Sequence, residues 1–162
     1  MHDRVCLDAA AKVCDNTYRV LGVYKADALS NLKASGIVGL APVNSKGSSY
    51  PLFMEEMYNA GAITSKVFSL YITNYFDGYQ SQGSKLLIGG FNLEKFAKAD
   101  SKITWNYLVN TNYWAVELVK VNVKGFDLKT RSTVAIVDSG TSYVMLPKED
   151  HRKLVAYFKS EF

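Results

Sequence analysis

The chain has 162 residues, of which 48% are hydrophobic and 13% aromatic, and a net charge of +4 from 19 basic and 15 acidic residues. This length is sufficient for a domain with a buried core. The basic residues are scattered rather than clustered, which argues against binding of nucleic acid. No apolar run approaches the roughly 20 residues of a membrane-spanning helix. We therefore expect a globular protein with no membrane span in this chain.

Two cysteines, Cys6 and Cys14, lie near the start of the chain. Their spacing fits neither a redox Cys-x-x-Cys motif nor a zinc site. If a hairpin places them on facing strands, as the flanking Val5 and Val13 allow, they can form a disulfide. The alternative is two buried free thiols. We favour the disulfide, which would indicate an oxidising compartment.

The first half of the chain reads as strands and turns around one helix. A strand is predicted over Tyr18–Tyr24, and glycines punctuate the apolar run Gly36–Leu40 as in a closely packed turn. Residues 44–50 read as a loop. Pro51 suits the first turn of a helix that Gly61 ends. Four side chains at helical spacing give this helix an apolar face, namely Phe53, Met54, Met57 and Tyr58.

The second half continues the β pattern and ends in another helix. Val67–Tyr75 and Lys85–Gly89 are predicted to pair around a loop at 77–84. Val116–Val123 alternates between apolar and polar residues, although the period breaks at Val119-Lys120. Pro147 begins the second helix, whose apolar face consists of Leu154, Val155 and Phe158. The sequence therefore predicts a mostly-β protein with short helices near 51–61 and 147–160.

The run Ala135-Ile136-Val137-Asp138-Ser139-Gly140-Thr141-Ser142 places a carboxylate directly after an apolar strand. Ser139 and backbone N–H groups can donate to the Asp138 oxygens, and Gly140 can adopt backbone angles that other residues avoid. Such an oriented carboxylate suits acid/base chemistry. The alternative is a strand-end aspartate that caps a turn, because a lone Asp-Ser-Gly often occurs by chance.

This run resembles the second active-site motif of pepsin-like aspartic endopeptidases. Other stretches resemble the same family in the same order, over roughly Leu32 to Pro147. They are the glycine-leucine turn Ser35–Pro42, the following strands at Val67–Tyr71 and Leu87–Gly90, and the aromatic positions Trp105, Tyr113 and Trp114. The resemblance implies a bilobal pepsin-like acid protease fold, here truncated at both ends.

The resemblance also implies roles for the residues of the motif. Asp138 would be one of two catalytic aspartates, and Ser139 would hydrogen-bond its carboxylate. Gly140 would let substrate backbone approach, while Thr141 and Ser142 would brace the loop or bond the substrate. Three further residues match cleft-lining positions of the family, although ordinary core packing is the alternative for them. They are Ile37, Tyr113 and Ile136.

Pepsin-like catalysis needs two aspartates that share one proton, because two carboxylates so close cannot both ionise. The chain holds no second Asp-Thr/Ser-Gly, and Asp77-Gly78 reads as a turn between strands. We therefore expect residues 1–102 to be the end of the N-terminal lobe with inter-lobe strands. Residues 103–162 would begin the C-terminal lobe. The missing remainder of the protease would supply the first aspartate and the flap, so this chain alone should be inactive.

The resemblance implies hydrolysis of peptide bonds by an activated water, with peptides or proteins as substrates and no metal or organic cofactor. It also implies a compartment reached by the secretory pathway, whether lysosomal, vacuole-like or extracellular. The alternative function is a catalytically inactive pepsin-like module that binds proteins through the same cleft. The intact Asp138-Ser139-Gly140 argues against this alternative.

Overall fold

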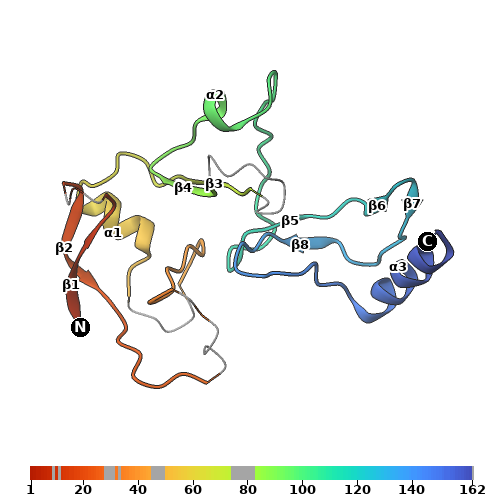
Figure 1. Cartoon of the computed structure of the whole chain (residues 1–162), viewed down its shortest axis with the longest axis horizontal. Helices are drawn as coiled ribbons and strands as arrows, with labels where there is room; N and C mark the ends of the chain where they lie inside the picture. Colours follow the sequence, from red (N-terminus) through yellow and green to blue (C-terminus); the bar gives the residue numbers. More distant parts are fainter. Residues whose placement is uncertain are drawn as a thin grey trace. The chain divides into compact units, whose positions relative to one another are not determined.

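The computed structural model describes residues 1–8, 10, 12–27, 32, 34–44, 50–73 and 83–161. The chain divides into two compact units, Met1–Leu40 with Lys46–Ile103 and Ala41–Ser45 with Thr104–Phe162. Within the described ranges, eight short strands form four two-stranded antiparallel sheets, accompanied by three helices (Figure 1). The mostly-β prediction is therefore confirmed. No helix in these ranges is both long and apolar enough to cross a membrane. Asp77-Gly78 lies outside them.

The first unit begins with a hairpin of β1 (His2–Cys6) and β2 (Cys14–Arg19). Cys6 pairs directly with Cys14 in this register, and the two form the predicted disulfide. The predicted strand at Tyr18–Tyr24 is wrong beyond Arg19. Its pairing ends with Val20, whose N–H donates to the Met1 carbonyl. Residues 21–24 find no ladder partner in the described chain, so propensity alone does not make them a strand.

Helix α1 (Phe53–Asn59) builds the core of the first unit and lies within the predicted helix at 51–61. Phe53, Met54 and Met57 are buried, together with Ile63 from the turn that follows. Tyr58, on the same predicted face, remains 44% exposed. Side chains from the hairpin and from β3 pack around this cluster, which explains why a helix this short holds its place.

Strands β3 (Phe68–Tyr71) and β4 (Lys85–Ile88) pair as the sequence predicts, with Phe68 opposite Ile88 and Tyr71 opposite Lys85. Their predicted extensions shorten, and residues 74–75 lie outside the described chain. Helix α2 (Leu93–Phe96) was not anticipated. The Asn92 side chain caps it by accepting the Lys95 N–H at 2.8 Å, and Phe96 contacts Tyr71 with ring centroids 4.9 Å apart.

The second unit is built on one long interrupted hairpin. Strand β5 (Ala115–Glu117) pairs with β8 (Val134–Ile136), and β6 (Asn122–Val123) pairs with β7 (Phe126–Asp127) beyond them (Figure 1). The break between β5 and β6 falls where the apolar alternation fails at Val119-Lys120. Lys124 (φ 48°) and Gly125 (φ 92°) form the tip, because a two-residue hairpin loop of this type needs positive φ at both positions.

Helix α3 (Lys148–Glu161) follows Pro147 as predicted. The Tyr157 ring stacks on Phe126 of β7, with centroids 4.3 Å apart and planes 6° from parallel. Leu128 is 1% exposed directly after β7. The Phe126–Tyr157 contact thus joins the helix to the hairpin.

At the hairpin tip, hydrogen bonds from Lys129 together with the charge of Lys120 lower the pKa of Asp127 to about 2.

We expect Met57→Ala to destabilise the first unit by about 2–5 kcal/mol, because Met57 is fully buried and the truncation leaves a cavity. Urea unfolding followed by circular dichroism measures this loss. Met145→Ala is the matched control, since Met145 is 78% exposed and its truncation should change stability little. Equal losses in the two variants would contradict the assigned core.

Candidate active site

Asp138 lies two residues beyond Ile136, the last residue of β8. The last pair of the β5–β8 ladder is Ala115 with Ile136. The N–H of Val137 then donates to the Trp114 carbonyl at 2.9 Å, which continues the pairing up to the aspartate. Ala115 is 1% exposed, so this end of the ladder is packed. The sheet therefore fixes the backbone from which the Asp138 side chain projects.

Two donors close a tight turn around the Asp138 carboxylate. The backbone N–H of Gly140 donates to Oδ1 at 2.9 Å, and the hydroxyl of Thr141 donates to Oδ2 at 2.6 Å. The N–H of Thr141 also donates to the Asp138 carbonyl at 3.3 Å. Aspartate side chains commonly bond to backbone two residues further on. Each carboxylate oxygen therefore has a donor from within the motif.

These hydrogen bonds set the electrostatics of Asp138. The Thr141 hydroxyl contributes most and the Gly140 N–H next to lowering the pKa of Asp138, and desolvation opposes them. Hydrogen bonds to the ionised form favour that form. The carboxylate is exposed, so it can reach solvent and a bound molecule. The arrangement is an open, oriented carboxylate whose ionised form is favoured by its two donors.

Two details of the motif differ from expectation. The donors to the Asp138 carboxylate are Gly140 and Thr141, and the Ser139 side chain is not among them. Gly140 does not have positive φ. The effect of a side chain here would be steric instead, because a Cβ at this position would lie 3.2 Å from Asp138 Oδ1 and the carboxylate would have to shift slightly. A side chain at 140 would therefore press directly on the carboxylate.

The predicted cleft residues belong to different units of the chain. Tyr113 (55% exposed) and Ile136 (56% exposed) belong to the same β5–β8 region of the second unit. The Tyr113 carbonyl accepts the N–H of Ala115, which pairs with Ile136. Ile37 (74% exposed) belongs to the first unit. Ser142 lies in the exposed segment after the turn.

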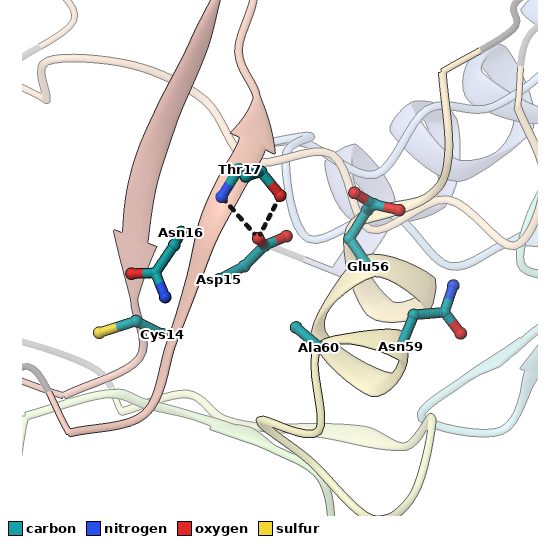
Figure 2. A pocket seen from close by; sticks show the side chains of 7 residues that line it. All are labelled: Cys14, Asp15, Asn16, Thr17, Glu56, Asn59 and Ala60. Atoms are coloured by element: carbon teal, nitrogen blue, oxygen red, sulfur yellow. Dashed lines mark hydrogen bonds between the residues drawn. The ribbon is translucent and has the colours of Figure 1, made fainter.

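A separate polar cavity of about 400 Å³ lies in the first unit between β2 and α1 (Figure 2). Asp15 and Glu56 both line it, and both help raise the pKa of Tyr18, after the larger effect of burial. Asp15 Oδ1 accepts the N–H of Thr17 at 2.8 Å and its hydroxyl at 3.2 Å, as Figure 2 shows. This carboxylate therefore stabilises the local backbone of β2 between Asp15 and Thr17.

The sequence interpretation missed Thr130 and Asp150, which join the segment before β8 to the start of α3. The Thr130 hydroxyl donates to Asp150 Oδ2 at 2.5 Å. The only sequence signal is an acidic residue in the first turn of a helix, and such residues usually face solvent. Asp150 is instead 4% exposed. The pairing is distant in sequence, so no local pattern reveals it.

The chain belongs to the eukaryotic aspartyl protease family, whose model matches residues 12–161. Among curated relatives, it is 26% identical to pepsin II-1 of Oryctolagus cuniculus over 88% of this chain and 36% of that protein. It is 30% identical to cathepsin E-A of Xenopus laevis over 71% of this chain and 28% of that protein. The chain thus spans about a third of the length of these relatives.

We expect Thr141→Val to raise the pKa of Asp138, because the variant lacks the hydroxyl that stabilises the ionised carboxylate. A lowered folded-state pKa stabilises the fold above the unfolded-state pKa, and this contribution is lost as pH falls through the folded-state value. The loss should therefore begin at higher pH in Thr141→Val. Carboxyl carbon NMR measures the titration. Thr141→Ser keeps the hydroxyl, so Asp138 should titrate in it as in the wild type. An unchanged pKa of Asp138 in Thr141→Val would contradict the role assigned to the Thr141 hydroxyl.

Proposed function

We propose that the protein is an aspartic endopeptidase in which Asp138 is one of two catalytic aspartates. The observation that carries this proposal is the Asp138 carboxylate itself, oriented by one donor on each oxygen at the end of a strand. Membership of the aspartyl protease family supports it, and the family match includes the whole motif. The substrates would be extended segments of peptides or proteins.

In the proposed reaction, one carboxylate takes a proton from a water that attacks the scissile carbonyl. The other carboxylate, protonated, polarises that carbonyl and later donates to the leaving amine. The donors from Gly140 and Thr141 favour the ionised form of Asp138. Asp138 therefore suits the role of the base, and its partner would carry the shared proton. This chemistry requires only the two carboxyl groups and water.

The second aspartate would come from outside this sequence, in the remainder of a longer protease that also supplies the flap. The limited coverage of the relatives, about a third of their length, supports this reading. In the proposal, residues 1–102 end the N-terminal lobe and residues 103–162 begin the C-terminal lobe. The Cys6–Cys14 disulfide supports an oxidising compartment, in the secretory pathway or beyond it.

We expect Asp138→Asn in the full-length protein to reduce peptide cleavage by several orders of magnitude while the fold persists. An amide of the same shape can neither accept the proton from water nor share a proton with a second carboxylate. Single-turnover cleavage of a quenched fluorescent peptide at acidic pH measures the effect. Asp127→Asn is a control with the same chemical change at the hairpin tip. Retention of more than about a tenth of the activity, equivalent to ~1.4 kcal/mol, would show that Asp138 is structural.

We expect the 162-residue chain alone to leave denatured protein substrates intact between about pH 3 and 6, because one carboxylate cannot act as both base and acid in the proposed cycle. Chromatography of the products measures cleavage. Turnover by the chain alone that Asp138→Asn abolishes would contradict the two-aspartate proposal. The protein-binding alternative instead predicts that the full-length protein also fails to cleave, yet retains peptides in a pull-down.

A further inference from the structure

A buried carboxylate of the second unit is not explained by the residues of the motif. Asp150 lies in the first turn of α3 and is 4% exposed. Its Oδ2 accepts the Thr130 hydroxyl at 2.5 Å, and its Oδ1 lies 3.8 Å from Lys153 Nζ. A buried carboxylate is costly unless it has such partners. Asp150 is therefore held in place by groups on both sides.

Thr130 extends this contact into the backbone that enters β8. Its oxygen accepts the N–H of Ser132 at 3.0 Å while its hydroxyl proton goes to Asp150. Two consecutive hydrogen bonds therefore connect the Ser132 N–H to the Thr130 hydroxyl and that hydroxyl to the Asp150 carboxylate. These two bonds link the segment before β8 to the beginning of α3 through side chains rather than through strand pairing.

Asp138 lies within the segment that this contact closes. Thr130 and Asp150 are 20 positions apart, and the chain between them passes through β8, the Asp138 turn and Pro147. Joining the two ends of a segment removes conformations in which they separate. A cavity of about 500 Å³ lies at this junction, lined by residues from both ends of the segment, among them Ser132, Pro147 and Asp150.

The two limbs of the segment are not equally supported. The part of the segment before Asp138 is hydrogen-bonded to the β5 side of the hairpin. The Leu118 N–H donates to the Thr133 carbonyl, and the Val137 N–H donates to the Trp114 carbonyl. After the turn, the residues up to Pro147 form no helix or strand, and three consecutive side chains there are 78–86% exposed. They are Tyr143, Val144 and Met145. The return limb therefore depends on its anchor at α3.

We propose that Asp150 is a positioning residue for Asp138. By accepting the Thr130 hydroxyl, it fixes the base of the segment and keeps the Gly140 N–H and the Thr141 hydroxyl aimed at the Asp138 carboxylate. Its side-chain partners in the described chain are Thr130 and Lys153, so in this proposal it acts on Asp138 through Thr130 and the segment between them. The catalytic consequence rests on the function proposed above, whereas the structural consequence does not.

A simpler role for Asp150 is to stabilise the N-terminus of α3 as an acidic residue in the first turn. Its neighbour Glu149 also lies in the first turn of α3, but it is exposed and pairs with Arg152 at 2.7 Å. Within the described chain, Glu149 forms no hydrogen bond or ion pair with the segment before β8. Removing the Glu149 carboxylate therefore tests helix stabilisation alone, whereas removing the Thr130–Asp150 bond also tests the positioning of Asp138.

The test uses the full-length protein and three variants. Thr130→Val removes the hydroxyl with little change of volume, Thr130→Ser restores it, and Glu149→Gln removes the exposed carboxylate on the same helical turn. Hydrogen exchange of the Gly140 and His151 amides is measured under conditions in which all variants are folded. The first amide donates to Asp138, and the second donates to Pro147 in the first turn of α3. Cleavage of a reporter peptide gives kcat and KM.

We expect Thr130→Val to accelerate exchange at Gly140 and to lower kcat by about tenfold to a hundredfold with KM little changed, as small misplacements of reacting groups do. Thr130→Ser should recover both, and Glu149→Gln should resemble the wild type. Unchanged exchange at Gly140 in Thr130→Val overturns the inference, whether or not His151 exchanges faster. If the wild type cleaves nothing but Gly140 exchange still responds, the positioning inference stands and the proposed function fails.

Discussion

The second unit depends on the pairing of β5 with β8. This ladder has three residue pairs, and the Val137–Trp114 bond extends it to the residue before Asp138. Successive residues of a strand point to opposite faces, so the register of this short ladder decides which way the aspartate projects. A slip by one residue would turn the carboxylate to the other face. The bonds from Leu118 to Thr133 and from Leu128 to Val121 continue the same hairpin toward its tip.

Features governed by neighbouring residues were predictable from the sequence. The pairing of Phe68–Tyr71 with Lys85–Ile88, the helices after Pro51 and Pro147, and the carboxylate at the end of an apolar strand all follow from local patterns. The disulfide followed from a hairpin, where facing cysteines are close. The Thr130–Asp150 contact could not be predicted in this way, because it joins residues 20 positions apart and neither belongs to a motif.

The errors of the sequence reading also have physical causes. The run after Arg19 has strand propensity, yet a strand needs a partner. In the part of the chain that the structure describes, residues 21–24 have no such partner, and Leu21 and Tyr24 are 85% and 100% exposed. Ser139 was expected to donate to Asp138, but the turn brings Thr141 to the carboxylate instead. Gly140 was expected to supply backbone freedom, but its φ is not positive, and the structure shows instead that a Cβ there would crowd the Asp138 carboxylate. In each case the outcome depended on which groups lie close together in three dimensions, and the sequence does not contain that information.

The carboxylates of the second unit are held by different means, and this matters for its behaviour in acid. Asp127 keeps its charge until its pKa of about 2, because Lys129 and Lys120 lie beside it, and Asp138 is held ionised by its hydrogen-bond donors. A lowered folded-state pKa gives stability that is lost only as pH falls through that lowered value. The hairpin tip and the candidate catalytic carboxylate therefore keep their interactions in a range where ordinary aspartates, with a pKa near 3.8, have begun to take up protons. In both places the ionised carboxylate is favoured by its local donors, although the donors come from Lys129 at the hairpin tip and from the turn itself at Asp138.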